Sequence, residues 1–328
     1  MDDIPSDRDR SRPLLSAVIL NYEHAAEAVT MIRATRAAEP ELFEATEWLL
    51  IHNGPDPAPT SDDVGPGVRV RTCKNRGYGS GFNQAFSWTT GDYVLALNAD
   101  VAYEEGFLEA THAVINDLSI REEASRTGVV GFRLLNEDGS HQGSAGQFPS
   151  LARFLLGQFQ SRATRKYLSL PTDRPSEVPW VTGACVLLNR RCFEEIGRFD
   201  DSYFMYYEDV DLCRRCWEAG WKVLFDPRPA LRHLHPYHAR SLTISMVRIA
   251  RPSLLRYFLK HRPQWESFLI ATIIQFESWW RQRWVGDEDR AHWQAIASEA
   301  RELCAEWHRN PDVVVSVPST ALHPLPKE

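Results

Sequence analysis

The chain has 328 residues, of which 43% are hydrophobic and 25% are charged, and its formal net charge is −7 at pH 7. This length is sufficient to bury a large core, and the composition is ordinary for a water-soluble globular protein. Proteins dedicated to nucleic-acid binding are normally basic, so the acidic balance argues against a nucleic-acid partner.

The N-terminal segment and the cysteines predict a cytoplasmic protein. Residues 1–13 are polar, lack the apolar core of a signal peptide and are expected to form a disordered tail. The six cysteines include one CxxC pair, Cys213 and Cys216, without the second pair of a zinc site, so their helical spacing favours ordinary packing. The longest apolar run, Phe268–Phe276, is far shorter than the roughly 20 residues of a spanning helix. The protein is expected to be soluble, or peripheral at the inner face of the membrane.

Short apolar runs alternate with helical patterns along the first half of the chain. Strands are expected at Leu14–Leu20, Trp48–Ile51, Val68–Arg71, Tyr93–Leu97, Val129–Leu134 and Trp221–Phe225. Helices are expected at Ala25–Ala38 and Gly79–Thr89, and Leu151–Leu170 is expected to be a helical or loop insertion. Buried strands alternating with helices predict an α/β fold with a doubly wound, mostly parallel sheet.

The C-terminal third differs in character from the rest of the chain. Residues 228–284 hold ten Lys or Arg against two Asp or Glu, interleaved with aromatic and aliphatic side chains. Gly286–Asp289 interrupts this pattern, Trp293–Trp307 predicts a final amphipathic helix, and Val313–Glu328 is a Pro-rich tail. The basic stretch is interpreted either as solvated helices packed on the main domain or as a docking face for an anionic acceptor at a membrane surface.

Polar residues follow three of the expected strands. Asn21, Asn53 and Asp100 each come at the end of an apolar run. Ligands of open α/β sheets bind outside the carboxyl ends of the strands, so these side chains predict a ligand crevice. The triplet Asn98-Ala99-Asp100 could place a carboxylate on a divalent cation that binds a diphosphate, or it could be an ordinary turn.

A glycine-rich loop, Asn75–Asn83, precedes one expected helix. Its glycines allow backbone N–H groups to approach an anionic ligand, and the helix adds a positive dipole end. The loop lacks the Gly-Lys-Ser/Thr of a phosphate-binding loop and the GxGxxG of a dinucleotide fingerprint. A plain surface loop is the alternative interpretation.

The segment Val181–Gly220 contains acidic residues grouped directly after an aromatic run. Glu208, Asp209 and Asp211 stand at the start of an expected helix, where a negative charge is favoured. A carboxylate held in this way suits a general base beside a substrate hydroxyl.

With these motifs in order, residues 14 to 241 resemble the inverting glycosyltransferases of family 2, which have the GT-A fold, and more narrowly their rhamnosyltransferase-like branch. The matching pieces are VILNY at 18–22, NRGYGSGFNQA at 75–85, GDYVLALNAD at 91–100 and VTGACVLLNRRCFEEIGRFDDSYFMYYEDVDLCRR at 181–215. The resemblance implies a GT-A catalytic domain at 14–245, with a nucleotide-sugar half at about 14–135 and an acceptor half at about 136–245. A helical region at 246–310 and a tail at 311–328 would follow.

The resemblance also implies roles for individual residues. The nucleotide-sugar would be bound by Asn21, Tyr22, Asn53, Gly81, Asn83, Asn98, Thr182 and Gly183. Asp100 would be the direct ligand of Mg²⁺ or Mn²⁺, and a histidine after the last strand would be a second ligand. His233 has about the expected spacing for this ligand, with His235 and His238 as alternatives.

The predicted reaction is a single displacement with inversion. Asp209 would be the general base that takes the proton of the acceptor hydroxyl, and Glu208 would orient the acceptor. The family more often has Asp at the position of His52, which alters the expected base pocket. The expected donor is a dTDP-, UDP- or GDP-sugar, with a deoxysugar such as rhamnose as the first choice.

The acceptor is expected to be a glycan or a lipid-linked intermediate of polysaccharide biosynthesis, with a small natural product as the alternative. Two other functions remain open, which are a catalytically silent sugar-nucleotide-binding protein of the same fold and a nicotinamide-dependent oxidoreductase. The intact Glu208, Asp209 and Asp100 argue against the first, and the missing fingerprint argues against the second. The oligomeric state is left open, a homodimer included.

Overall fold

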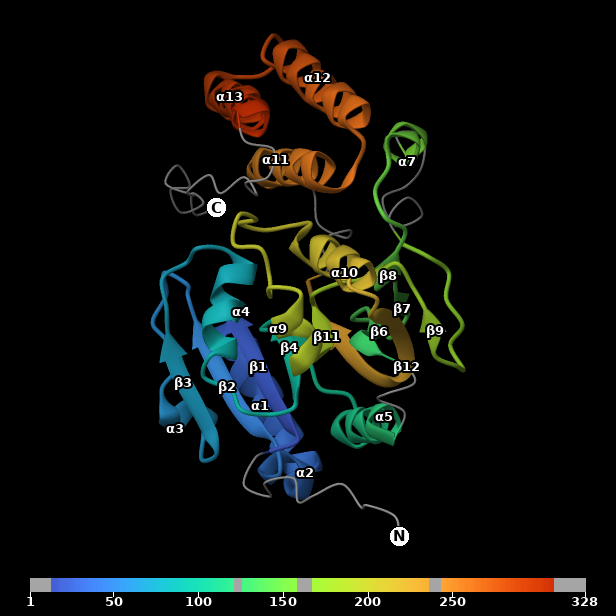
Figure 1. Cartoon of the computed structure of the whole chain (residues 1–328). Coiled ribbons are helices and arrows are strands. Elements are labelled where there is room, and N and C mark those ends of the chain that lie inside the picture. The colour runs from blue at the N-terminus through green and yellow to red at the C-terminus, as the bar shows by residue number, and fades with distance from the viewer. Residues whose placement is uncertain (1–12, 121–125, 158–166, 236–242, 310–328) are drawn as a thin grey trace.

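The computed structural model describes residues 13–120, 126–157, 167–235 and 243–309. Within these residues an α/β unit is built on one large sheet, and a group of C-terminal helices lies beyond one end of it (Figure 1). Apart from Pro13, both predicted tails lie outside the described residues. None of the described helices combines the length and apolarity needed to span a membrane.

The large sheet is mixed but mostly parallel. Its main strands are β1 (Leu15–Asn21), β2 (Glu47–His52), β3 (Val68–Thr72), β4 (Tyr93–Asn98), β5 (Val101–Ala102), β6 (Thr127–Leu135), β11 (Cys185–Asn189) and β12 (Lys222–His233). They lie in the order β3-β2-β1-β4-β11-β6-β12-β5. The pairs β1–β2, β1–β4, β2–β3 and β6–β12 are parallel, whereas β11 runs antiparallel between β4 and β6. The predicted doubly wound, mostly parallel sheet is therefore confirmed.

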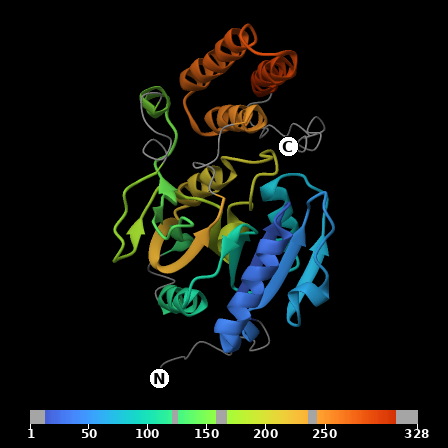
Figure 2. The same ribbon diagram turned by 180° about the vertical axis from the view of Figure 1, so that it is seen from behind.

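Helices cover both faces of this sheet. They are α1 (Ala25–Ala38), α2 (Pro40–Glu44), α3 (Ser61–Val64), α4 (Tyr78–Phe86), α5 (Phe107–Ile120), α9 (Arg190–Glu195) and α10 (Glu208–Glu218). A further helix, α7 (Leu151–Leu156), lies away from the sheet (Figure 1). Val18 and Leu20 of β1 belong to the same apolar core as Phe82 of α4, whereas the alternate residue Ile19 packs in the core that contains Ile32 of α1. Figure 1 accordingly shows α4 in front of the sheet, and the reverse view in Figure 2 shows α1 in front of it.

Besides β5, four two-residue strands were not predicted. They are β7 (His141–Gln142), β8 (Ala145–Gly146), β9 (Ser176–Glu177) and β10 (Trp180–Val181). Two residues carry no readable periodicity, and these strands exist only through pairing with distant partners such as β6 and β12.

The strand expected at Trp221–Phe225 was predicted too short, because β12 continues to His233. Its pairing with β6 shifts between Asp226 and Ala230, at a bulge that contains two prolines. Proline has no N–H for the ladder, so pairing is interrupted there and resumes beyond it. The continuation matters because it carries His233 to the edge where the site lies.

Three C-terminal helices pack against one another in the described part of the chain, α11 (Ile244–His261), α12 (Gln264–Arg281) and α13 (Asp287–Arg309). This confirms the predicted helical extension. The final helix begins at Asp287, earlier than the expected Trp293. The apolar pattern did not show this start, because the first turn of the helix is polar and acidic. Figure 1 shows α11 between α10 and the other two helices.

Candidate functional site

The carboxyl ends of the parallel strands bring several predicted residues to one edge of the sheet. Asn21 pairs in register with His52, and the neighbouring Leu20 pairs with Asn98. Residues one step beyond these ends, including Asn53, continue along the same edge. The polar residues predicted to line a ligand crevice therefore lie together where β1, β2 and β4 end.

Asp100 and His233 meet because β5 pairs with the end of β12. His233 is opposite Val101 in this antiparallel pair, and the N–H of Leu234 donates to the carbonyl of Asp100 at 2.9 Å. The His233 Nε2 lies 3.4 Å from the Asp100 Oδ1, and both side chains are buried. A carboxylate and an imidazole held this close form a pair of ligands suited to a divalent cation.

Gln142 lies behind His233 and bears on whether a metal fits there. Its side-chain nitrogen is 2.9 Å from the His233 Nδ1, while its side-chain oxygen is buried without a hydrogen-bond partner. Turning the amide over places this oxygen against Nδ1, where it accepts the ring proton and leaves a lone pair on Nε2. That tautomer is the one that a metal ligand requires, and the outer hydrogen bond fixes the ring. The residues present therefore fit a divalent cation.

The other expected histidines do not share this position. His235 stacks on His24 with ring centroids 5.1 Å apart, and its Nε2 is 4.0 Å from the Glu27 carboxylate. His238 lies outside the described residues. Residues two apart in a strand point to the same side, but β12 ends at His233, so His235 lies beyond the ladder and its side chain reaches different neighbours.

Asp209 stands in the first turn of α10 and faces the turn after β10. Its Oδ1 accepts from the N–H of Val210 at 2.8 Å, and its Oδ2 accepts from the N–H of Gly183 at 3.2 Å. Glu208 beside it is buried. The preceding Tyr206 and Tyr207 both have positive φ, at 69° and 70°, which is strained for residues with a side chain. The backbone thus adopts an energetically unfavourable left-handed conformation directly before Glu208 and Asp209.

Tyr78 is a site residue that the sequence interpretation did not single out. Its hydroxyl donates to the carbonyl of Gly183 at 2.8 Å. Burial raises the pKa of Tyr78 well above its ordinary value, and the negative charges of Glu208, Asp209 and Asp100 raise it further. The negative charges of all three carboxylates therefore act on one side chain. The tyrosine in the quoted NRGYGSGFNQA motif was the available signal.

Thr182 and Gly183, which were predicted to bind the nucleotide-sugar, lie in a turn that is hydrogen-bonded on two sides. The N–H of Thr182 donates to the carbonyl of Ser144 at 2.8 Å, and Gly183 contacts both Tyr78 and Asp209 as described. Both residues remain partly exposed, so this turn lies at the open side of the site.

The glycine-rich loop packs against protein at its start. Gly77 has φ 100°, and a Cβ on it would lie 2.1 Å from the Phe204 carbonyl oxygen. The N–H of Tyr78 donates to that same oxygen at 2.9 Å. Gly81, further along, is close to Leu20 and to the Asn53 amide, so the loop places α4 against the strand ends. The backbone of this loop thus helps to fix the position of the aromatic run that precedes α10.

The polar residues at the ends of β1 and β2 form a small network. The Asn21 amide bonds the His52 Nδ1 at 2.8 Å and accepts from the N–H of His24, and the His52 Nε2 contacts the carbonyl of Asp56. Both ring nitrogens of His52 are therefore engaged. By contrast, the Asn53 Oδ1 is buried without a partner, which leaves an acceptor for a ligand.

Tyr22, Asn98 and Asn83 complete the predicted set. Tyr22 is partly buried, and burial followed by the charges of Glu23 and Asp56 raises its pKa. Asn98 is partly exposed at the end of β4. The Asn83 amide bonds the backbone of Phe199 in both directions, so any donor contact would compete with these bonds.

Asp211 belongs to a separate, buried ion cluster. It is fully buried and accepts from Arg215 at 2.8 Å, from Lys260 at 2.8 Å and from His261 at 2.7 Å. Burial raises the pKa of Asp211, but the His261 hydrogen bond and the charges of Arg215 and Lys260 outweigh it and hold the pKa well below its usual range. Asp211 therefore anchors α10 to α11 rather than stabilising the start of the helix alone.

The two cysteines of the CxxC pair play no part in the site. Cys213 and Cys216 are both buried and free, and burial raises the pKa of Cys213. The predicted packing role is confirmed.

Comparison with known sequences gives one family and several relatives. The model of a family described as glycosyltransferase like family 2 matches residues 60–252. The N-acetylglucosaminyl-diphospho-decaprenol L-rhamnosyltransferase of Mycobacterium tuberculosis (strain H37Rv) is 34% identical over 196 residues, which cover 53% of this chain and 61% of that protein. Rhamnosyltransferase WbbL of Escherichia coli (strain K12) is 26% identical over 179 residues, covering 52% and 63%. The chain thus matches about three fifths of the length of these relatives.

A solved structure supports the same fold. The crystal structure of GalNAc-T7 with UDP, GalNAc and Mn²⁺ aligns with a TM-score of 0.56 at 13% identity, covering 92% of this chain and 58% of that one. Together with the sheet order, this likeness confirms the predicted GT-A fold.

Proposed function

Since the chain belongs to glycosyltransferase like family 2, we propose that it transfers a sugar from a nucleoside-diphosphate donor to an acceptor hydroxyl. The observation that supports this most directly is the position of Tyr78, whose hydroxyl bonds the same Gly183 turn as Asp209, and whose pKa is raised by burial and then by the negative charges of Glu208, Asp209 and Asp100. These are the acceptor-side acids and the metal-side acid of the predicted reaction, and they act on one side chain. The site therefore has the charges that an inverting transfer needs.

Asp209 is the general base of this proposal. Its carboxylate is partly exposed and is oriented by the N–H groups of Val210 and Gly183. An acceptor hydroxyl within hydrogen-bond reach would lose its proton to Asp209 as its oxygen attacks the anomeric carbon from the face opposite the leaving diphosphate. Single displacement of this kind inverts the anomeric centre. Glu208, adjacent and buried, would orient the acceptor.

A divalent cation, Mg²⁺ or Mn²⁺, would be held by Asp100 and His233. When bound, it would neutralise the charge of the leaving diphosphate. GalNAc-T7, which shares the fold, was crystallised with Mn²⁺. Tyr78 and the turn at Gly183 would form the wall between this pair and Asp209, because the Tyr78 hydroxyl bonds that turn.

The donor nucleotide would occupy the ends of β1 and β2. The unpartnered Asn53 oxygen would accept a hydrogen bond from the ribose or the base, with Asn21 and Tyr22 beside it. The rhamnosyltransferase names of two relatives favour a deoxysugar such as rhamnose, carried on dTDP, over other sugars carried on UDP or GDP. The decaprenol-linked substrate in the name of one of them favours a lipid-linked glycan as acceptor.

A panel of nucleoside diphosphates tests the donor assignment. Because a ligand that binds only the folded protein stabilises it by mass action, the matching nucleotide at about 100 times its Kd should add about 2.7 kcal/mol to the free energy of unfolding. We expect dTDP with Mn²⁺ to raise the melting temperature, and the rise to diminish without Mn²⁺. Metal-dependent release of the nucleotide from its sugar then distinguishes a transferase from a silent binding protein. Equal melting temperatures across the panel would contradict the proposal.

Replacing Gln142 tests the metal ligands without reference to turnover. Loss of the outer hydrogen bond to a metal-binding histidine typically weakens metal binding by about 10- to 100-fold, so we expect Gln142→Leu to do so for Mn²⁺. Gln142→Glu should bind Mn²⁺ as tightly as the parent protein. Titration followed by electron paramagnetic resonance of free Mn²⁺ measures both, and Gln294→Leu, on α13, is the control. Unchanged affinity in Gln142→Leu would mean that His233 is not a ligand.

A further inference from the structure

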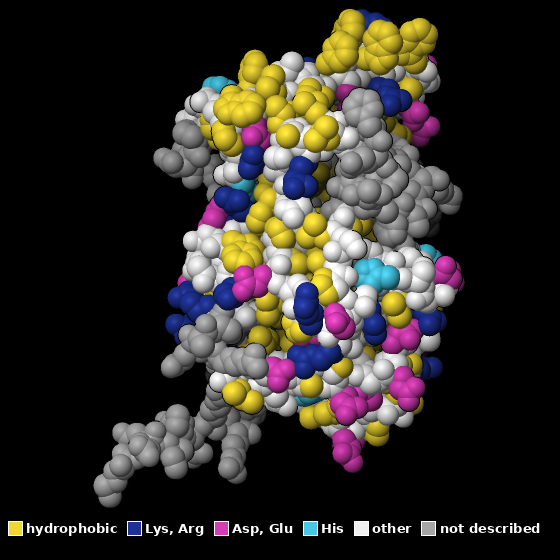
Figure 3. Space-filling model, turned by 90° about the vertical axis from the view of Figure 1, so that its right-hand side faces the viewer, with side chains coloured by type: hydrophobic (Ala, Val, Ile, Leu, Met, Phe, Trp, Pro, Cys, Tyr) yellow, Lys and Arg dark blue, Asp and Glu magenta, His cyan; other side chains and the backbone are white. Residues whose placement is uncertain are grey.

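Helix α12 is apolar on two opposite faces. Its inner face, which includes Ile270, Ala271 and Ile274, is buried among the C-terminal helices. Its outer face carries large hydrophobic side chains that are exposed to solvent. Figure 3 shows hydrophobic side chains gathered at the top of the molecule, where these helices lie.

The outer side chains form one stripe, here called the aromatic face. It consists of Trp265, Phe268, Phe276, Trp279, Trp280 and Trp284. Their exposed fractions range from 48% to 72%. At 3.6 residues per turn and a rise of 1.5 Å per residue, the first five fall within an arc of roughly 120° and extend about 23 Å along the helix. Trp284 follows just beyond the end of α12. A soluble monomer rarely exposes a continuous apolar surface of this extent, so the face is expected to contact a partner.

The segment that contains the aromatic face is basic, although three acids, Asp287, Glu288 and Asp289, follow it at the start of α13. Residues 244–284 contain seven Lys or Arg and two Asp or Glu. Both acids are neutralised by arginines, since Arg262 pairs with Glu266 and Arg251 pairs with Glu277. Arg281 and Arg283, at the C-terminal end of the aromatic face, have no acidic partner among the described residues. Arg283 instead stacks over the Trp279 ring at 3.4 Å.

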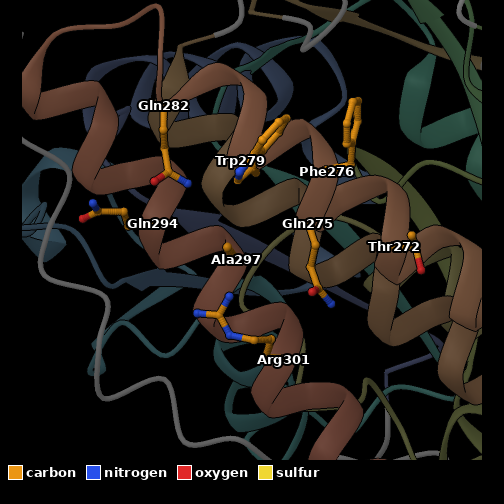
Figure 4. A pocket seen from close by; sticks show the side chains of 8 residues that line it. All are labelled: Thr272, Gln275, Phe276, Trp279, Gln282, Gln294, Ala297 and Arg301. Carbon is orange, nitrogen blue, oxygen red and sulfur yellow. The ribbon is translucent and has the colours of Figure 1, made fainter.

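A shallow groove adjoins the aromatic face, between α12 and α13. It has a volume of about 660 Å³, and Phe276 and Trp279 form part of both its wall and the aromatic face. Figure 4 shows the polar part of the lining, in which Gln275 comes from α12, Gln282 directly follows that helix and Arg301 comes from α13. Arg301 makes no hydrogen bond or ion pair with the rest of the described chain. An unpaired guanidinium beside amides and aromatic rings suits a phosphate group next to an apolar chain.

From these features we infer that the aromatic face of α12 docks on an anionic lipid surface. Four of its six residues are tryptophan, whose ring prefers the boundary between headgroups and acyl chains. None of these four indole N–H groups donates to another described residue, so each is available to lipid carbonyls, phosphates or water. The neighbouring arginines match the negative surface of such a membrane. Contact of this kind lies in the interface and requires no spanning helix.

Within the basic stretch at 228–284, the predicted membrane contact is thereby limited to one face of α12. Several of its cations serve other purposes: Arg228 pairs with Asp117 and Asp226, and Lys260 pairs with Asp200 and Asp211. The inference does not depend on the identity of the donor or the acceptor, so it can be tested independently of the proposed sugar transfer.

Vesicle binding by the full chain tests the inference. The protein is sedimented with vesicles of phosphatidylcholine alone and of phosphatidylcholine with phosphatidylglycerol, at low and high salt. We expect binding to the anionic vesicles that weakens with salt, and quenching of tryptophan fluorescence when the lipid chains are brominated. Phe276→Ser/Trp280→Ser should weaken binding by about tenfold or more, because most of the binding free energy comes from buried apolar area. Ile120→Ser, which removes an exposed hydrophobic side chain from α5, is the matched control.

The possible outcomes distinguish membrane binding by the aromatic face from binding of another partner. If the double variant loses its cooperative melting, Arg281→Gln/Arg283→Gln replaces it and should weaken binding to the anionic vesicles only. Failure to bind anionic vesicles at low salt overturns the inference, as does equal binding by the parent and both variants. Sedimentation velocity showing a dimer that Phe276→Ser/Trp280→Ser dissociates, with no vesicle binding, would instead assign the face to a second copy of the chain.

Discussion

Replacing Asp209 with asparagine is expected to reduce sugar transfer by about 10²- to 10⁴-fold, the range that a general base contributes. The substitution keeps the size of the side chain and the oxygen that accepts from the N–H of Val210. It removes the ability to take the acceptor proton. Nucleotide binding should be nearly unchanged, because the donor residues lie at the ends of β1 and β2 on other elements. The measurement compares transfer rate and nucleotide affinity in the same preparation.

Two controls define this result. Asp92→Asn changes an exposed carboxylate before β4 and should leave the transfer rate unaltered. Donor hydrolysis by water, which needs no acceptor, should fall less than transfer in Asp209→Asn. Full transfer by Asp209→Asn would remove this residue from the role of base, and a large loss of nucleotide affinity would point to a structural defect instead.

Replacing Asp211 with asparagine should lower the free energy of unfolding by about 3–5 kcal/mol, the usual cost of breaking a buried ion pair from one side. The fully buried carboxylate accepts from three donors, and its removal leaves Arg215 without an acidic partner and Lys260 with Asp200 alone. Chemical denaturation at pH 7 measures the loss. Asp289→Asn, at an exposed position of α13, should change stability little.

The same cluster predicts a pH dependence. The pKa of Asp211 is held below its ordinary value in the folded protein, so its stabilisation is complete above the unfolded pKa of about 3.9. It is lost as the pH falls through the folded value. The difference in stability between the parent protein and Asp211→Asn should therefore shrink below about pH 4. A constant difference from pH 7 to the lowest pH at which both remain folded would contradict this account.

The local pattern of the chain predicted its regular elements well. Helix α1 was predicted with its observed bounds, and β1, β2, β3 and β4 were each predicted within one residue at either end. These segments are short, apolar and bounded by polar residues, so their limits are visible in sequence. The error in β12 came from Pro227 and Pro229, which usually end a strand but here form a bulge that a long parallel partner tolerates.

The candidate site was less predictable, because its contacts join distant parts of the chain. Tyr78 bonds a residue 105 positions away, and Gln142 contacts a residue 91 positions away. No local periodicity carries such pairings. The motifs did single out Asp100, Asp209 and His233, but the hydrogen bonds that orient them, from Gln142 or from the turn at Gly183, required the folded chain.

The ion cluster at Asp211 also bears on where this protein's smallest working unit ends. The matched family region stops at residue 252, yet two donors to Asp211 follow it, Lys260 and His261, near the end of α11. In addition, the Ser253 hydroxyl donates to the carbonyl of Met205 in the aromatic run that precedes Glu208 and Asp209. The helix that presents Asp209 is therefore buttressed from outside the shared region. Exchanging the segment after residue 252 for an unrelated one would remove these contacts and disturb the position of Asp209.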